Sequence, residues 1–332
     1  MAQQRILVTG GAGFIGSHYV RHLLGREHHG GPLVTVLDKF TYAGNPANLD
    51  PVSGHPSLRV VRGDIADAAL VRRLLAGHDQ VVHFAAETHV DRSIESADAF
   101  VRTNVLGTQT LLDAALHTGV RTFLHISTDE VYGSVEHGSS TEDAPLAPNS
   151  PYAASKAASD LLALAQHRTH GLDVRITRCS NNYGPRQLPE KLIPRFVTTL
   201  MEGRHVPLYG DGLHVRDWLH VDDHVRGIES VRALGRPGEI YNIGGGTELT
   251  NRELTGQLLA ACGADWSRVR HVTDRKGHDR RYCVDWSKAR EELGYSPGRN
   301  FAAGLAETVA WYRDNPSWWE ASVAHREVGS AV

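Results

Sequence analysis

The chain has 332 residues, enough for one large or two unequal domains, and a formal net charge of -3 from 35 Lys and Arg against 38 Asp and Glu. This balance excludes a protein whose bulk charge drives nucleic-acid binding, and we expect no nucleic-acid partner. No apolar run approaches the roughly 20 residues of a membrane span, and no apolar leader precedes the first predicted strand, so we expect no membrane partner.

Cysteine and histidine usage adds to this picture. The three cysteines, Cys179, Cys262 and Cys283, lack C-x-x-C spacing, which is typical of a reducing compartment. The 20 histidines are scattered without an H-E-x-x-H pattern, so we expect no metal site. These features predict a soluble, cytoplasmic protein.

The N-terminus carries a dinucleotide-binding pattern. The apolar run 5–9 leads into residues 10–16, Gly-Gly-Ala-Gly-Phe-Ile-Gly, and a helical stretch follows at 17–24. Strand, glycine turn and helix in this order let the backbone approach a pyrophosphate at the helix N-terminus. The next strand ends in Asp38, whose carboxylate can bind adenosine ribose hydroxyls and would repel a 2′-phosphate. The pattern favours NAD over NADP, although Lys39 could serve as a phosphate partner.

Apolar runs alternate with helical patterns through the first half of the chain. Predicted strands at 58–61, 80–84, 121–127 and 173–179 are interleaved with predicted helices at 68–75, 99–116 and 153–167. This alternation predicts an α/β fold with a doubly wound parallel sheet of Rossmann type. Ligands in such a fold bind beyond the carboxyl ends of the strands, which is where the singled-out residues fall.

After Cys179 the pattern changes, because residues 181–194 are punctuated by Pro and Gly. We predict a Rossmann domain at 1–180, to which the chain returns at about 217–243, and a smaller, discontinuous substrate lobe within 181–332. Thr250 and Glu253 form a capping-box pattern that opens a helix to residue 261. A final helix is predicted at about 302–313.

Two groups of residues carry the predicted chemistry. Tyr152 and Lys156 lie four residues apart on one helix face, where the ammonium would lower the pKa of the phenol. Asp129 and Glu130 follow the predicted strand 121–127 and supply two further proton carriers. Oxidation of an alcohol needs only one base, so the pair indicates chemistry beyond hydride transfer. Both acids can serve only if the strand has ended, because adjacent strand residues face opposite ways.

These motifs together resemble the extended short-chain dehydrogenase/reductase family over essentially the whole chain. The shared motifs are residues 9–16, 83–86, 152–156 and 182–185. Within the family the chain is similar to nucleotide-sugar 4,6-dehydratases, on residues 87–93, 127–132, 216–218 and 275–282. The Asp-Glu pair is the most specific discriminator, because related nucleotide-sugar epimerases usually lack it.

The resemblance implies a redox-neutral, NAD-dependent lyase that converts dTDP-glucose to dTDP-4-keto-6-deoxyglucose through C4 oxidation, loss of water across C5 and C6, and hydride return to C6. Tyr152 would take the 4-OH proton, with Lys156 holding the phenolate and the nicotinamide ribose. Glu130 would remove the C5 proton, Asp129 would protonate the departing 6-OH, and Thr128 would hydrogen-bond the 4-OH. Asp129 must then stay protonated beside an ionised Glu130, which requires a raised pKa.

The resemblance also implies binding residues and an assembly. The expected cofactor residues are Gly10, Gly13, Phe14, Ile15, Gly16, Asp38, Lys39, Phe40, Thr41, Asp64, Ile65, Phe84, Ala85, Ala86, Thr88, Thr103, Tyr152, Lys156 and Asn182. The expected substrate residues are Thr88, Thr128, Tyr152, Asn181, Lys191, Leu192, Pro207, Tyr209, Arg216, Asn251, Arg275 and His278. The family implies a homodimer through helices 99–116 and 153–167, although burial within one subunit would explain their apolar faces equally well.

Three other functions remain open at this stage. A 4,6-dehydratase of a UDP- or GDP-sugar would keep the chemistry and change the base contacts. A nucleotide-sugar 4-epimerase would keep Tyr152, Lys156 and NAD without needing Asp129 or Glu130. A non-catalytic NAD-binding regulator is the alternative from a different class, and such proteins often lose the Tyr-Lys pair.

Overall fold

A parallel sheet of seven strands forms the centre of the larger part of the molecule in the computed structural model, which describes residues 3–25 and 31–320. The strands are arranged in the order β3-β2-β1-β4-β5-β6-β10 and every neighbouring pair is parallel. Their bounds are β1 Arg5–Thr9, β2 Leu33–Asp38, β3 Leu58–Arg62, β4 Gln80–His83, β5 Thr122–Thr128, β6 Asp173–Cys179 and β10 Ile240–Ile243. The predicted doubly wound α/β sheet is confirmed, and the direction of strand order reverses between β1 and β4.

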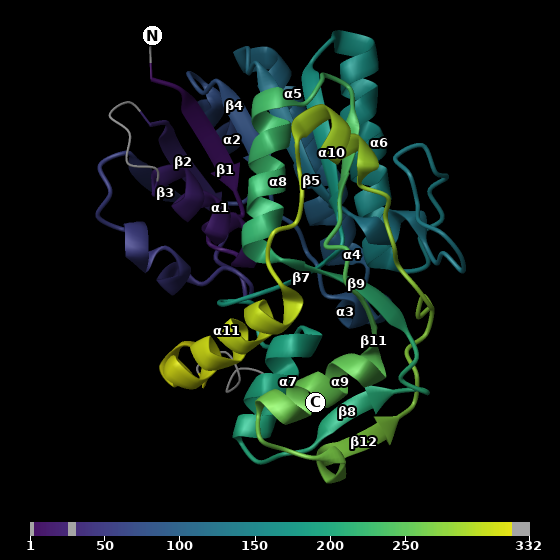
Figure 1. Cartoon of the computed structure of the whole chain (residues 1–332). Helices are drawn as coiled ribbons and strands as arrows, with labels where there is room; N and C mark the ends of the chain where they lie inside the picture. Colours follow the sequence, from purple (N-terminus) through teal and green to yellow (C-terminus); the bar gives the residue numbers. More distant parts are fainter. Residues whose placement is uncertain (1–2, 26–30, 321–332) are drawn as a thin grey trace.

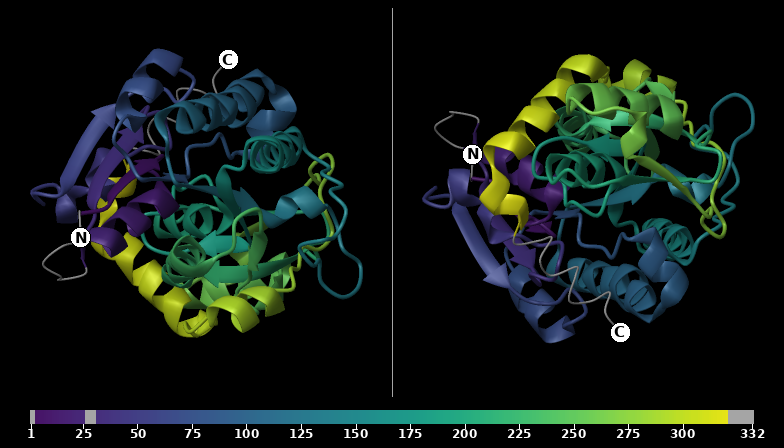
Figure 2. Two further views of the ribbon diagram at one scale, coloured as in Figure 1. Left: turned by 90° about the horizontal axis from the view of Figure 1, so that it is seen from above. Right: turned by 90° about the horizontal axis from the view of Figure 1, so that it is seen from below.

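Helices cover both faces of this sheet (Figure 1). On one face lie α1 Phe14–Leu24, α8 Val221–Leu234 and α10 Ser287–Leu293. On the other lie α2 Ala68–Leu75, α5 Thr108–Thr118 and α6 Pro151–His170. Each face has its own apolar core, which explains why the inner strands are continuous apolar runs. Figure 2 shows the layers end-on, with the blue and teal helices opposite the green and yellow ones.

The predicted single helix at 99–116 is interrupted by a π-helical segment. The run consists of α4 Asp98–Phe100, the π-helical η3 Val101–Gly107, and α5. The amide of Asn104, which lies in η3, donates to the Glu87 carbonyl at 3.0 Å and to Ser155 Oγ at 2.8 Å, and it accepts from the Glu87 N–H at 2.9 Å. A widened turn of this kind often marks a functional site, and here it fastens the loop after β4 to α6.

The smaller part of the molecule contains two minor sheets and the remaining long helices. One sheet joins β7 Asn181–Tyr183, β9 Val215–His220 and β11 Glu248–Thr250, and the other joins β8 Val206–Tyr209 to β12 Val269–Val272. These sheets and the helices share a third apolar core, to which α7 Leu192–Met201, α9 Asn251–Ala261 and α11 Phe301–Asp314 contribute. Residues 217–220 lie in β9 of a minor sheet, so the chain rejoins the main sheet at α8 and β10, and α10 later covers the same sheet.

Two local predictions about this part can be checked directly. Thr250 and Glu253 form the predicted capping box, with the Thr250 hydroxyl accepting from the Glu253 N–H at 3.1 Å. All three cysteines are free thiols. Among the described residues, no helix combines the length and apolar character that crossing a membrane requires.

Candidate active site

One cavity of about 430 Å³ lies at the carboxyl ends of the main strands and brings the predicted residues together. All five predicted catalytic residues line it: Thr128, Asp129, Glu130, Tyr152 and Lys156. Every predicted substrate residue lines it too, and so does every predicted cofactor residue except Phe40. The side chain of Phe40 packs instead against the apolar core around α1.

The glycine turn after β1 is shaped for a phosphate group. Gly10 has a φ of 68°, and a Cβ there would lie 2.6 Å from the Ala85 nitrogen. A Cβ on Gly16 would lie 2.3 Å from the Gly10 carbonyl oxygen. No side chain caps the N-terminus of α1 at Gly13, and this helix end lines the cavity. This arrangement fits the pyrophosphate of a dinucleotide.

Asp38 and Lys39 at the end of β2 occupy different environments. The Asp38 carboxylate is buried and accepts the Ala12 N–H at 2.9 Å and the Phe40 N–H at 2.8 Å. These bonds fix the carboxylate against the glycine turn and leave lone pairs for ribose hydroxyls. Lys39 Nζ is 2.8 Å from Asp64 Oδ2, so its charge is engaged within the protein. The geometry therefore favours NAD over a cofactor with a 2′-phosphate.

The chain leaves the strand conformation directly before the two acids. Strand β5 ends at Thr128, and Asp129 begins the 3₁₀ turn η4 Asp129–Tyr132. Thr128 Oγ1 accepts the Glu130 N–H at 3.3 Å and lies 3.2 Å from Asp129 Oδ1. Because the strand has ended, Asp129 and Glu130 do not face opposite sides of the sheet, and both line the same cavity.

Burial and charge act differently on the two acids. Burial raises the pKa of Asp129 well above its usual range, and the charges of Glu130 and Asp217 raise it further. Burial also raises the pKa of Glu130, but the cations Lys191, Arg216 and Arg275 act in the opposite direction. The two carboxyl groups interact, so their titrations are coupled. The pKa of Asp129 is raised more than that of Glu130, so Asp129 keeps its proton and Glu130 is the easier group to ionise.

Tyr152 and Lys156 sit in the first turns of α6, whose N-terminus is capped by Ser150. Burial lowers the pKa of Lys156 to about 8, and its Nζ donates to the Ile126 carbonyl at 2.8 Å. The pKa of Tyr152 is raised well above 10, first by burial and then by the charge of Glu130. The expectation that the lysine lowers this pKa is therefore wrong for the protein without ligands, because desolvation of the phenolate is the larger effect.

Basic side chains from the smaller part of the molecule extend over the acids. Arg216 donates to the Asp279 carbonyl at 2.9 Å and lies over the Tyr282 ring at 4.3 Å. Arg275 pairs with Asp91 through contacts of 2.5 and 3.1 Å, which ties this part to the first turn of α3 Val90–Glu95. Our sequence predictions omitted Asp91, Asp279 and Tyr282 as site residues, although all three lie within the motifs 87–93 and 275–282.

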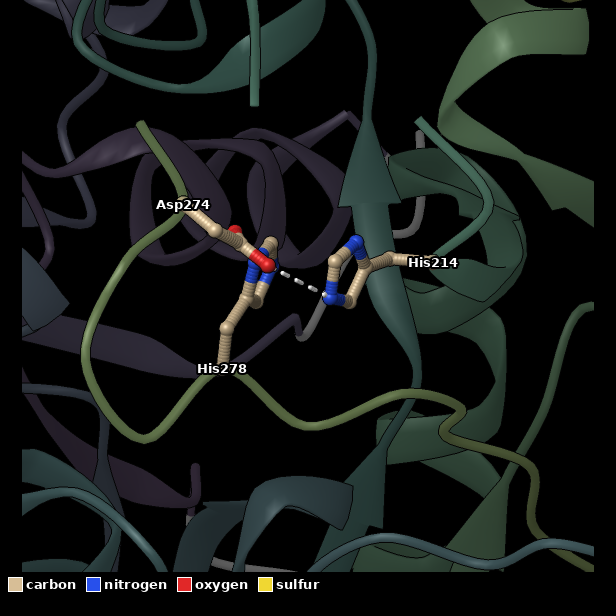
Figure 3. Close-up of side chains that lie close together, drawn as sticks. All are labelled: His214, Asp274 and His278. Carbon is tan, nitrogen blue, oxygen red and sulfur yellow. Dashed lines mark hydrogen bonds and ion pairs between the residues drawn. The ribbon is translucent and has the colours of Figure 1, made fainter. Parts of the chain in front are cut away.

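His278 belongs to a compact group with His214 and Asp274 (Figure 3). Asp274 Oδ1 is 2.7 Å from His278 Nδ1, and Asp274 Oδ2 is 3.3 Å from His214 Nε2. The two imidazole rings stack with centroids 3.7 Å apart and planes at 14°. The Asp274 carboxylate contacts one nitrogen of each ring and so holds the two side chains together. It fixes the loop that carries Arg275.

Comparisons with known proteins agree with this geometry. A family model described as GDP-mannose 4,6 dehydratase matches residues 7–308. A dTDP-glucose 4,6-dehydratase of Streptomyces griseus is 68% identical over 318 residues, which cover 95% of this chain and 96% of that protein. A crystal structure of a dTDP-glucose 4,6-dehydratase from Streptomyces venezuelae with NAD bound is 64% identical, with a TM-score of 0.95 over 96% of this chain and 100% of that one. A UDP-glucose 4-epimerase structure from Thermotoga maritima is 32% identical, with a TM-score of 0.87 over 94% of this chain and 100% of that one.

The raised pKa of Asp129 predicts how stability depends on pH. The folded chain holds a proton that the unfolded chain releases above about pH 4, so wild-type stability should fall by up to about 1.4 kcal/mol per pH unit until the folded pKa is reached. Asp129→Asn removes this contribution and should flatten the decline. Urea unfolding between about pH 5 and pH 8 measures the difference. The control, Asp143→Asn, removes an exposed carboxylate and should parallel wild type. Parallel curves for Asp129→Asn would contradict the assignment.

Proposed function

Because the chain belongs to the GDP-mannose 4,6-dehydratase family, we propose that it is a lyase that removes water from a nucleotide sugar, with dTDP-glucose as its substrate and NAD as its cofactor. Identities of 62–68% to dTDP-glucose 4,6-dehydratases over 95% of the chain support this substrate. The observation that carries the reaction type is the pair of acids that line one cavity with Tyr152, the buried Asp129 and the half-buried Glu130. The pKa of Asp129 is raised well above its usual range, whereas three cations oppose the rise in the pKa of Glu130.

The cofactor half of the cavity suits NAD. When bound, NAD accepts the C4 hydride of the sugar and returns it to C6. We infer that the glycine turn and the N-terminus of α1 bind the pyrophosphate, and that Asp38 binds the adenosine ribose. Asp64 and Ile65 line the cavity beside Asp38 and are assigned to the adenine edge. We further propose that 1–180, α8, β10 and α10 form the NAD-binding domain and that the remaining described part of 181–332 forms the sugar-nucleotide lobe. Residues 26–30 and 321–332 lie outside the described residues.

The proton transfers follow from the positions of four side chains. Tyr152 takes the proton of the 4-OH, and Thr128 orients that hydroxyl. The resulting 4-ketone makes the C5 proton acidic. Glu130 removes the C5 proton, while Asp129, which holds a proton because it is buried, donates it to the departing 6-OH and releases water. Glu130 then returns its proton to C5 as hydride reaches C6.

Recognition of the nucleotide diphosphate is assigned to the basic residues of the smaller lobe. Arg216 and Arg275 present guanidinium groups, whose planar fork matches phosphate oxygens. Lys191 Nζ already donates to the Thr88 carbonyl at 2.7 Å and so joins the two halves of the cavity. Tyr209, which lies under Arg275 at 5.6 Å, offers a ring on which a base can stack.

Mass spectrometry of nucleotide sugars incubated with the pure protein and no added reductant tests this proposal. We expect dTDP-glucose to lose the mass of one water without net accumulation of NADH, while UDP-glucose and dTDP-galactose remain unchanged. Glu130→Gln should slow water loss by about 10²- to 10⁴-fold, because the C5 base is gone. Water loss from another nucleotide sugar alone would overturn the substrate. A new stereoisomer of unchanged mass would indicate an epimerase, and a cofactor-bound protein without any reaction would indicate a regulator.

We also propose a homodimer formed through η3, α5 and α6. Val101, Leu106 and Leu161 are more than half exposed on these helices, and η3 packs beside α6, so they supply apolar surface to one side of the molecule. Exposed apolar groups gathered in this way mark an association surface.

Replacing two of these leucines tests the proposed dimer. Sedimentation equilibrium should give about twice 36.4 kDa for wild type and a monomer for the double variant Leu106→Glu/Leu161→Glu, because buried carboxylates would oppose association. The control Leu234→Glu changes an exposed leucine on α8 and should leave the mass unchanged. A monomeric wild type would contradict the proposal.

A further inference from the structure

A buried carboxylate lies one helical turn beyond Lys156. Asp160 follows Lys156 by four residues on α6, so the two side chains share one face of the helix. Both are almost fully buried, with exposures of 0% for Asp160 and 4% for Lys156. Asp160 does not line the cavity and cannot touch a substrate there. The reaction proposed above gives this carboxylate no direct part.

Asp160 is held from two neighbouring strands. Arg178 on β6 approaches Asp160 Oδ2 with its Nε at 2.8 Å, and its guanidinium lies 4.7 Å from the centre of the Tyr132 ring. His125 on β5 lies with its Nε2 3.3 Å from Asp160 Oδ1. Burial raises the pKa of Asp160, but the contacts with His125, Arg178 and Lys156 outweigh it and lower the pKa overall. The carboxylate is therefore ionised at neutral pH.

The surrounding groups leave the cluster with one excess positive charge. Burial lowers the pKa of His125 to about 4 and that of His83 on β4 well below its usual range, so both rings are neutral. Burial also raises the pKa of the Cys179 thiol on β6, so this group carries no charge either. Two cations and one anion remain, Lys156, Arg178 and Asp160. Formation of a phenolate at Tyr152 would neutralise the excess.

We propose that Asp160 is a positioning residue whose buried carboxylate keeps Lys156 in its ammonium form next to Tyr152. A lysine at this depth loses its proton easily, because an ammonium group is costly to desolvate. A carboxylate on the same helix face offsets that cost without entering the cavity. Arg178 and His125 keep the carboxylate itself ionised and fixed. The role of the ammonium in catalysis rests on the function proposed above, whereas its protonation can be measured without turnover.

Removal of the carboxylate has a defined consequence. In Asp160→Asn two buried cations remain, and Arg178 cannot release its proton, so the charge lost must be that of Lys156. Wild-type Lys156 has a pKa of about 8, and its ammonium form is lost as pH rises through that value. The variant should lose the ammonium at a lower pH. The high-pH limb of the kcat profile should move to lower pH with it.

The lysine content of the chain makes a direct measurement practicable. There are five lysines, Lys39, Lys156, Lys191, Lys276 and Lys288, so ¹³Cε-labelled lysine gives a spectrum in which the Lys156 signal is identified by its absence from Lys156→Met. We expect the Lys156 titration midpoint to fall by about one pH unit or more in Asp160→Asn. Asp160→Glu, which retains the charge, should restore most of the shift. A midpoint unchanged in Asp160→Asn would overturn the proposal.

Two further variants separate this effect from a loss of stability. If Asp160→Asn does not fold, Asp160→Asn/Arg178→Met removes both charges of the pair, and the Lys156 midpoint should still lie below the wild-type value. The matched control is Glu229→Gln, because Glu229 forms a comparable ion pair with Arg232 at 2.7 Å on α8, remote from the cavity. It should lower stability without moving the Lys156 midpoint or the pH profile of kcat. An inactive wild type would refute the proposed function. The Lys156 titration would still decide whether Asp160 keeps Lys156 in its ammonium form.

Discussion

The register of β5 between its two parallel neighbours is the constraint on which the site depends. Thr128 is paired with Cys179 at the end of β6, and His125 is paired with His83 at the end of β4. Main-chain hydrogen bonds therefore fix where β5 stops, and the chain turns directly after Thr128. If the strand continued for two more residues, Asp129 and Glu130 would face opposite sides of the sheet. The early turn brings both into one cavity.

Burial also determines which of the ionisable groups in the cavity hold a proton. Asp129 keeps its proton because burial and the charges of Glu130 and Asp217 outweigh the effect of Arg216 on its pKa, while three basic side chains of the smaller lobe oppose the effect of burial on Glu130. Tyr152 is desolvated, so its phenolate needs positive charge nearby. Lys156 and the buried carboxylate of Asp160 lie on the same helix as Tyr152, which links the sheet interior to the chemistry at its edge.

Much of the fold could be predicted because its signals are local. The strand that precedes the glycine turn, the acid at the end of β2 and the strand β6 were placed correctly, since apolar runs, glycine spacing and capping patterns are read within short windows. The catalytic groups were predicted from short motifs in the same way.

Contacts between distant segments could not be predicted from the sequence. The side chain of Phe40 packs into the core, Lys39 is bound by Asp64, and Arg275 is bound by Asp91, which lies 184 residues earlier. No sequence window contains both partners of such a pair. The raised pKa of Tyr152 was missed for a related reason, because burial depends on the packing of the complete domain.

Transfer of an isotope within the sugar tests the central claim most directly. With dTDP-glucose deuterated at C4 as the substrate, the account predicts that deuterium appears at C6 of the 4-keto-6-deoxy product, because the hydride removed from C4 is returned within the same active site. Deuterium retained at C4 of a changed stereoisomer, or lost to solvent without reaching C6, would contradict the account.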